Sequence, residues 1–461
     1  MTMIDRHDRI RTLLDRDFRG AVIDPGHADY QSARRVWNGM IDKNPSLILR
    51  PEDVPSVQAA VRIAGELQLP VAVRGGGHNI AGNGTCDGEI VLDLGLLGGP
   101  EIDPRQRTAR VPGGMTWGPL DRATQAHGLA TVGGMVSTTG VGGLTLGGGV
   151  GWLMRSHGLT CDNLISAELV TATGELLTVS DREHSDLMWA LRGAGGNFGV
   201  VTDFTYRLHP VDTVVGGFAM YPLDRAGEVL RCYSDYCEGC PDTLTTLAVL
   251  TTAPGEPFVP ESMRAKPALL IAVCAVGGGA ADDVAALIAA LGEPIVNLIG
   301  PMPYSDMQSM QDPTAPHGSR NYWRSGFLPD LSPDTIDRLV EFAASAPSAM
   351  TQIHLHQMGG AVARVAGDAT AVPFRDAPFM LNIVTMWADP DDDAINLEWL
   401  ADCWRKIESA TRSSYSNFLS DDEADRFRTA HSAPTWNRLR DIKTEWDPDN
   451  MFRFNQNIPP R

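Results

Sequence analysis

Residues 74–84 read RGGGHNIAGNG, and they follow the apolar run VAV at residues 71–73. Two later segments have the same density of glycine, GVGGLTLGGGVG at residues 140–151 and GAGGNFG at residues 193–199. Glycine reaches positive φ angles and lets backbone N–H groups approach a bound anion closely. One such loop is often an ordinary turn. Three of them together favour a site where backbone groups hold a pyrophosphate.

The glycine pattern excludes two familiar phosphate-binding motifs. A Walker loop ends in Gly-Lys-Ser/Thr, whereas residues 149–152 read GVGW and contain no lysine. A Rossmann fingerprint places G-x-G-x-x-G between the first strand and helix of a βαβ unit, with an acidic residue about 20 positions later. No segment supplies that context. The sequence therefore predicts another nucleotide-binding architecture.

The remainder of the chain predicts an α+β fold. Residues 51–69 have the apolar spacing of a helix and lead into a short strand at residues 70–73, while residues 166–173 form a further apolar strand. After about residue 210, predicted helices separate further strands, among them residues 268–276, 352–357 and 379–387. A chain of 461 residues commonly divides into two domains. We place the boundary near residue 212.

Charge and hydropathy exclude several classes of partner. The formal net charge of −19 repels phosphate backbones and anionic lipid, so nucleic acid is not an expected partner. Apolar runs such as residues 268–276 are far shorter than the roughly 20 residues that cross a bilayer. The first 18 residues are charged throughout and lack the apolar core of an export signal. We expect a cytoplasmic protein with reduced cysteines and no membrane contact.

The cysteines do not predict a metal site. The chain has seven of them, and Cys232, Cys237 and Cys240 form the one cluster. A structural zinc site needs four ligands, and no second Cys or His pair follows at a matching interval. We therefore predict no bound metal.

Five segments together resemble the berberine-bridge-enzyme-like branch of the vanillyl-alcohol oxidase superfamily. They are VAVRGGGHN (71–79), TTGVGGLTLGGGVGWL (138–153), GLTCDNL (158–164), WALRGAGGNFGVVT (189–202) and DPDNMFRFNQNIPP (447–460). The resemblance implies an FAD-binding domain of the p-cresol methylhydroxylase type at residues 1–212, built from two α+β pieces. It also implies a substrate domain on an antiparallel sheet at residues 213–412 and a segment at 413–461 that returns to the flavin.

The same resemblance implies which residues hold the FAD. They are Arg74, Gly75, Gly76, Gly77, His78, Asn79, Gly82, Ser137, Thr139, Gly140, Gly142, Gly143, Gly147, Gly148, Gly151, Trp152, Asn163, Gly199, Val200, Val201, Asn417, Asn455 and Asn457.

His78 ends the RGGGH run, where the family joins a histidine to the 8α carbon of the flavin. An ordinary histidine is mostly neutral at pH 7, as a nucleophile must be. Many relatives add a second bond from a cysteine, but the aligned run GMVSTTG at residues 134–140 has Val136 there. Cys86 and Cys161 belong to other motifs. We therefore expect FAD bound covalently through His78 alone, with no cysteinyl bond.

Oxidation of a C–H bond by flavin requires a group that takes the remaining proton. Tyr415 matches the family's Y-x-N-F segment, but a phenol needs a lowered pKa to act as a base. In the strand QIHLH, alternation places Gln352, His354 and His356 on one face, which lines the site or faces water. Some relatives have a carboxylate at the position of His354. We favour Tyr415, with His354 as the alternative.

Two further positions bear on the reaction. Asn382 occupies the place where plant relatives have glutamate, and an amide cannot be a base. Thr139 stands where valine in relatives leaves room for O2 and leucine excludes it. We expect an oxidase that transfers hydride from a small organic substrate to FAD and releases H2O2. The alternatives are an O2-independent dehydrogenase, a tailoring enzyme that cyclises a secondary metabolite, and a flavin-binding protein without turnover. We expect a monomer or homodimer.

Overall fold

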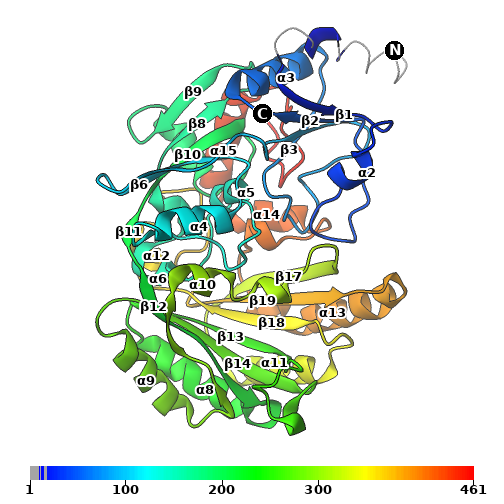
Figure 1. Ribbon diagram of the computed structural model, residues 1–461. Helices are drawn as coiled ribbons and strands as arrows, with labels where there is room; N and C mark the ends of the chain where they lie inside the picture. Colours follow the sequence, from blue (N-terminus) through cyan, green and yellow to red (C-terminus); the bar gives the residue numbers. More distant parts are fainter. Residues whose placement is uncertain (1–9, 11, 15–17) are drawn as a thin grey trace.

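The computed structural model describes residues 10, 12–14 and 18–461. The expected absence of an export signal rests largely on residues 1–9, 11 and 15–17, which lie outside the described residues. Three larger sheets organise the described part of the chain, two in its first half and one in its second, and a further sheet has two strands (Figure 1).

The first sheet has four strands in the order β1-β2-β4-β3, in which β2, β4 and β3 are parallel and β1 is antiparallel. Helix α3 covers it, and its apolar face packs on the strands. The side chain of Asp53 accepts a hydrogen bond from the Ser56 amide and so begins the helix after the predicted residue 51. The bounds are β1 (Gly20–Ile23), α2 (Tyr30–Ala33), β2 (Leu47–Pro51), α3 (Val54–Glu66), β3 (Val71–Arg74) and β4 (Ile90–Asp93).

The second sheet has five antiparallel strands in the order β5-β6-β10-β8-β9. Its buried face forms one core with α4, α5 and α7. The bounds are β5 (Glu101–Asp103), β6 (Thr108–Pro112), α4 (Trp117–Gln125), β7 (Leu129–Ala130), α5 (Val141–Leu146), α6 (Met154–His157), β8 (Leu164–Val170), β9 (Leu176–Ser180), α7 (Ser185–Leu191), β10 (Val200–Arg207) and β11 (His209–Pro210), which pairs with β7.

The third sheet is antiparallel throughout and runs β15-β12-β14-β13-β18-β19-β17, with β16 also paired to β12. This confirms the antiparallel sheet that the resemblance implied for the second half of the chain. The strands predicted at 352–357 and 379–387 are β18 and β19, and the one predicted at 268–276 is β14. The bounds are β12 (Thr213–Pro222), β13 (Leu244–Thr252), β14 (Pro267–Ala275), β15 (Val296–Asn297), β16 (Gly300–Pro303), β17 (Arg320–Leu328), β18 (Gln352–Gln357) and β19 (Phe379–Trp387).

Helices cover the face of the third sheet that is turned away from the other two sheets (Figure 1). Their apolar sides share a core with Ile353, Leu355, Leu381 and Ile383. Because side chains alternate along a strand, the even-numbered residues of β18 and β19 point to the opposite face. That face is turned toward the glycine loops. The helices are α8 (Leu223–Glu238), α9 (Ala280–Leu291), α11 (Pro333–Ser345) and α13 (Asp393–Ile407), and the shorter α10 (Tyr304–Ser309) and α12 (Ala361–Arg364) lie elsewhere.

After α14 (Ala424–Ala430) and α15 (Ala433–Trp446), the C-terminal segment returns to the first half of the chain (Figure 1). The backbone N–H of Val71 donates to the carbonyl of Met451 at 3.0 Å, and the Met451 and Phe452 side chains join the core of the first sheet. The buried Lys443 ammonium bonds to Asp447 at 2.6 Å and to the Asn197 carbonyl at 2.7 Å. The tail therefore closes over the third glycine loop.

Among the described residues, no helix is both long and apolar enough to cross a membrane. Within the same part of the chain, no group of three or more His, Cys, Asp or Glu side chains is arranged to hold a metal ion. All seven cysteines are described, and their thiols are free.

Candidate active site

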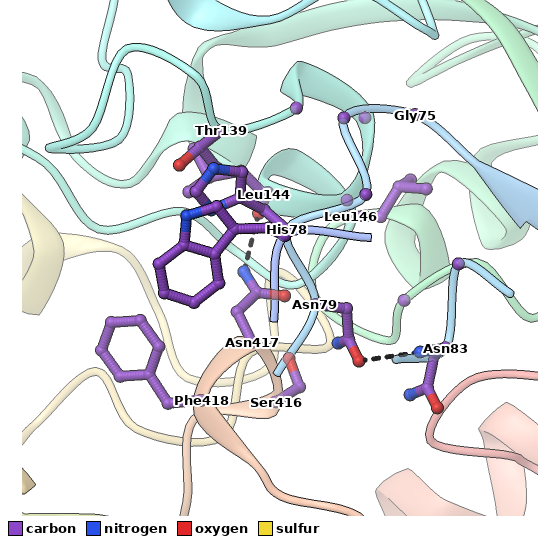
Figure 2. Close-up of a pocket in the computed structure, with 18 of the residues that line it drawn as sticks. Gly75, His78, Asn79, Asn83, Thr139, Leu144, Leu146, Ser416, Asn417 and Phe418 are labelled. Atoms are coloured by element: carbon purple, nitrogen blue, oxygen red, sulfur yellow. Dashed lines mark hydrogen bonds between the residues drawn. The ribbon is translucent and has the colours of Figure 1, made fainter. Parts of the chain in front are cut away.

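A long cavity lies between the three glycine segments and one face of the third sheet, which presents the even-numbered residues of β18 and β19 and the odd-numbered Asn321 and Trp323 of β17. Figure 2 shows part of its wall, formed by residues from Gly75 to Asn83, Thr139 to Leu146 and Ser416 to Phe418. The cavity thus joins segments from both halves of the chain and from the C-terminal segment.

The glycine loops approach one another too closely for any side chain at their contact. A Cβ added at Gly140 would lie 2.3 Å from the backbone nitrogen of Gly76, and one added at Gly76 would lie 2.5 Å from the nitrogen of Gly140. By contrast, Gly143 and Gly196 line the cavity with nothing within 4 Å of an added Cβ. Glycine therefore permits the loop contact in one place and leaves bare backbone facing the cavity in another.

Arg74 stands at the start of the first loop and lines the cavity, but its guanidinium binds protein groups. It donates to a carboxylate oxygen of Asp93 at 3.0 Å and to the carbonyl of Ala33 at 2.7 Å. These bonds neutralise the charge and hold the loop in place. Arg74 is the single Arg or Lys among the described lining residues, and no Asp, Glu or Cys lines the cavity there.

His78 opens onto the cavity and has two neighbours that orient its ring. Its Nε2 lies 2.8 Å from the hydroxyl of Thr138, and its ring stacks on Trp37 with centroids 4.7 Å apart and planes 19° apart. Burial, reinforced by the charge of His317, lowers the pKa of His78 to about 3. The imidazole is therefore neutral at pH 7 and has a lone pair available.

Tyr415 lies at the start of a short 3₁₀ turn, Ser416–Phe418, with its side chain 1% exposed and its ring lining the cavity. Its phenolic oxygen accepts hydrogen bonds from the backbone N–H groups of Gly149 and Val150 and from the side-chain amide of Asn417. Burial raises the pKa of Tyr415 to about 12, while these donors pull it down. The phenol therefore holds its proton at neutral pH. The three N–H donors stabilise the phenolate that forms when this proton leaves.

The polar face predicted for QIHLH does line the cavity, because Gln352, His354 and His356 all contribute to its wall. Nε2 of His354 lies 2.8 Å from the side-chain oxygen of Gln352. Burial lowers the pKa of His354 to about 4 and that of His356 further, with His354 adding to the effect on His356. Asn382 stands directly opposite His354 on β19. Both imidazoles are therefore neutral above about pH 5.

Most of the residues predicted to hold the cofactor or act on the substrate line this one cavity. They are Arg74, Gly75, Gly76, Gly77, His78, Asn79, Thr139, Gly140, Gly142, Gly143, Gly199, Val201, His354, His356, Asn382, Tyr415, Asn417 and Asn455. Residues more than 300 positions apart in the sequence thus meet at a single site.

Other predicted residues support the wall from behind. Trp152 and Val200 lie in hydrophobic cores, and Ser137 donates to the carboxylate of Asp312 at 2.6 Å. The side-chain amide of Asn163 donates to the carbonyls of His157 and Leu159. The predicted residues that do not line the cavity are Gly82, Ser137, Gly147, Gly148, Gly151, Trp152, Asn163, Val200 and Asn457.

Sequence patterns did not identify the aromatic and polar residues at the far end of the cavity. They are Trp37, Gln311, Thr314, Asn321 and Trp323, which meet Phe418 of the Y-x-N-F segment. Trp323 and Asn321 alternate along β17 in the way that His354 and His356 do along β18, so alternation was the available signal. Trp37 belongs to an irregular segment, and its contact with His78 has no local signature.

The cavity fits the FAD that the resemblance implied. Bare glycine backbone faces it from all three loops, and the side-chain oxygen of Asn455, one of its lining residues, is buried without a hydrogen-bond partner. Such an atom costs about 1–3 kcal/mol unless a ligand or water bonds to it. The C-terminal residues Asn455 and Gln456 line the cavity beside the third glycine segment, which matches a cofactor enclosed by the returning tail.

Comparison with known proteins agrees with this geometry. Residues 45–180 match the family described as FAD binding domain, and residues 414–459 match the family described as berberine and berberine like. An FAD-linked oxidoreductase of Dictyostelium discoideum is 33% identical over 96% of this chain and 95% of that protein. The (R)-6-hydroxynicotine oxidase of Paenarthrobacter nicotinovorans is 30% identical over 96% of this chain and 97% of that protein.

A solved structure extends the match to three dimensions. The crystal structure of 6-hydroxy-D-nicotine oxidase from Arthrobacter nicotinovorans superposes with a TM-score of 0.85 at 29% identity, covering 96% of this chain and 98% of that one. Sequence, fold and cavity agree, and this chain belongs to the berberine-bridge-enzyme-like FAD-linked oxidoreductases, as an FAD-dependent enzyme.

Proposed function

We propose that this enzyme is an oxidase that carries FAD covalently on His78 and oxidises a small organic substrate, with O2 as the final acceptor and H2O2 as a product. One observation carries the proposal. His78 presents a neutral imidazole to the cavity that the glycine loops and the polar face of β18 share.

The ring contacts of His78 suit a nucleophile. When Nε2–H donates to the hydroxyl of Thr138, the lone pair resides on Nδ1, which is then the nitrogen available to the flavin. The stacked Trp37 restricts rotation of the ring. Attachment through a single residue also agrees with Val136, which lines the cavity at the position of the second linkage in relatives.

Bound FAD supplies a hydride acceptor, and the chain supplies the group that receives the substrate proton. We assign that role to Tyr415. Its oxygen already accepts three N–H donors, from Gly149, Val150 and Asn417, which stabilise a phenolate as it forms. His354 is the alternative, because its imidazole is neutral and lines the same cavity.

The test of attachment is acid precipitation of the purified holoenzyme. The parent should retain yellow flavin in the pellet, whereas His78→Ala should release it to the supernatant. Mass spectrometry of proteolytic fragments should find the FAD mass on the peptide that contains His78 and on no cysteine peptide. Complete release of flavin from the parent would contradict covalent attachment.

Oxidase activity is tested separately, by measuring H2O2 with a panel of alcohols, amines and phenols. Substrates that reduce the flavin without peroxide release would favour a dehydrogenase. A flavin that only complex polyketide-like aromatics reduce would favour a tailoring enzyme. The cytoplasmic location remains a prediction, which cell fractionation tests. The monomeric or homodimeric state also remains a prediction, which size-exclusion chromatography tests.

A further inference from the structure

The part of the cavity wall formed by β18 and β19, which we call the substrate end, contains buried polar atoms with no hydrogen-bond partner. Both ring nitrogens of His356 and the side-chain oxygen of Asn382 lack hydrogen bonds, although His356 is 3% exposed and Asn382 1% exposed. Both residues line the cavity. They are diagonal neighbours on paired strands, since His356 stands opposite Met380 and His354 opposite Asn382.

Leaving such atoms unpaired is costly. A buried donor or acceptor without a partner costs about 1–3 kcal/mol, and a fold that keeps three of them on one wall gains nothing in stability. Hydrogen bonds to a bound molecule would explain why these unpaired atoms lie on the cavity wall. His354 differs, because Gln352 already engages its Nε2.

The aromatic side chains at this end stand nearly at right angles to one another. Trp37 meets Trp323 at 75° with ring centroids 6.0 Å apart, and Trp323 meets Phe418 at 77° and 5.4 Å. Val384 and Met386 extend the apolar surface along β19. These walls form an apolar corner that suits a flat ring.

No ionic partner for a charged molecule lines this corner. Among the described lining residues, Arg74 is the single charged side chain, and Asp93 neutralises it. Burying an unpaired ion costs several kcal/mol. Cation–π attraction to these rings returns about 0.5–2 kcal/mol, which is too little to compensate. The site therefore favours a neutral ligand.

We propose that His356 and Asn382 recognise a hydroxyl group on a neutral aromatic substrate, whose ring lies in the corner formed by Trp37, Trp323 and Phe418. This inference rests on the proposed function for its placement of the substrate. A neutral imidazole offers one donor and one acceptor, and the Asn382 oxygen is an acceptor. A hydroxyl both accepts from the imidazole N–H and donates to the amide oxygen, whereas a methyl, ether or carbonyl group cannot do both.

The test is calorimetric titration of the oxidised holoenzyme with naphthalene probes of one shape. 2-Naphthol has the hydroxyl, 2-methylnaphthalene lacks it, and 2-naphthoate and 2-naphthylmethylammonium carry charges of either sign. In the first three probes, no carbon atom carries both a hydrogen and a hydroxyl or amino group. The flavin therefore has no hydride to accept, and these probes bind without turnover. The ammonium probe is titrated without oxygen, with the flavin spectrum recorded. We expect 2-naphthol to bind at least about tenfold more tightly than the others.

Two substitutions remove the hydrogen-bonding groups. His356→Leu and Asn382→Val should each weaken 2-naphthol binding by about tenfold and leave 2-methylnaphthalene unchanged. Neither should lower the thermal midpoint of the ligand-free protein by more than a few degrees, because each removes an unpaired buried atom. Thr385→Val is the matched control. Thr385 is also buried on β19 with an unpaired hydroxyl, but it does not line the cavity, so its variant should bind like the parent.

A change of charge gives an independent check. Asn382→Asp places a carboxylate in the corner, so it should reverse the preference and make the ammonium probe bind more tightly than 2-naphthol. The inference is overturned if a charged probe binds the parent best, if 2-naphthol has no advantage over 2-methylnaphthalene, or if both the His356→Leu and Asn382→Val variants keep that advantage. Acid precipitation of the same preparation tests flavin attachment separately, so loss of one result does not affect the other.

Discussion

The phenolic oxygen of Tyr415 accepts a hydrogen bond from the side-chain nitrogen of Asn417 at 2.9 Å. The backbone N–H groups of Gly149 and Val150 donate to the same oxygen at 3.2 Å each. Burial still dominates and raises the pKa of Tyr415 to about 12. The opposed directions of burial and hydrogen bonding make the pH dependence of the reaction a sharp test of the base.

If Tyr415 removes the substrate proton, anaerobic flavin reduction should accelerate as pH rises from 7 toward 10, because the phenolate fraction grows below a pKa of about 12. His354, whose pKa is lowered to about 4, is already deprotonated over that range and would give a flat profile. Tyr415→Phe should slow reduction by about 10²- to 10⁴-fold and leave covalent FAD intact. Stopped-flow absorbance measures both effects.

The control for this assignment is Asn417→Asp, which replaces the donor to the phenol with an acceptor and should move the alkaline rise to higher pH. His354→Ala should keep the rise with a smaller loss of rate. A parent profile that is flat from pH 6 to 10, together with a Tyr415→Phe variant of parental rate, would assign the proton to His354.

The Thr138 hydroxyl, 2.8 Å from Nε2 of His78, should speed covalent attachment by holding the ring. Thr138→Val should slow flavin incorporation into apoprotein about 2- to 10-fold, the cost of one hydrogen bond, while Thr138→Ser should restore it. Thr138 is exposed, so folding should be unaffected. The acid-stable flavin fraction, followed over time, is the measurement. Equal rates of flavin incorporation in the Thr138→Val and Thr138→Ser variants would show that the hydroxyl does not assist attachment.

Gly140→Ala should damage the cofactor site without straining the backbone. Its φ of −71° is open to any residue, but an added Cβ would lie 2.3 Å from the nitrogen of Gly76. The loops must separate, at a cost of about 1–3 kcal/mol. Differential scanning calorimetry and flavin content report the loss. Gly99→Ala is the control, since nothing lies within 4 Å of its added Cβ. Full FAD content in Gly140→Ala would show that the loop contact is dispensable.

Thr139 lines the cavity, and its size should control access of O2 to the flavin. Thr139→Leu should slow reoxidation of the reduced enzyme by about tenfold or more while leaving substrate reduction near the parental rate, because the larger side chain fills space beside the cofactor. Thr139→Val keeps the shape and should reoxidise like the parent. Mixing reduced enzyme with oxygenated buffer measures the rate. A leucine variant that reoxidises normally would place the oxygen path elsewhere.

Stability should fall in acid partly because of His209. Its ring stacks on His157 with centroids 3.7 Å apart, and burial, His157 and Arg207 lower its pKa to about 4. Between pH 6.5 and 4 the unfolded chain binds a proton that the folded chain does not, so unfolding is favoured as pH falls. His209→Gln should reduce the loss over this window by about 1–2 kcal/mol. Urea unfolding at pH 7 and 4.5 measures it. His127 is exposed, so His127→Gln is the control. An identical loss of stability between pH 7 and 4.5 in the two variants would contradict the assignment to His209.

Local sequence patterns predicted much of the fold. The alternation of QIHLH placed Gln352, His354 and His356 on one face, and β18 has the predicted bounds. Glycine density located the three segments that line the cavity, although residues 141–146 of the second segment form helix α5. Helix α3 begins at Val54 instead of residue 51, because Asp53 caps it. These features depend on backbone freedom and on side-chain alternation within one segment, so a single stretch of sequence contains the information.

By itself, the sequence determined that a glycine-lined, backbone-built site exists, that His78 belongs to it, and that two histidines share a strand face. Only the tertiary structure decided which residues meet there. Trp37 stacks on His78, Asn382 stands opposite His354, and Trp323 and Phe418 form the apolar corner. The physical reason is that strand register and sheet order follow from burying the opposite, apolar face against helices distant in sequence. The neighbours on the cavity face are a consequence of that packing, and no local pattern encodes them.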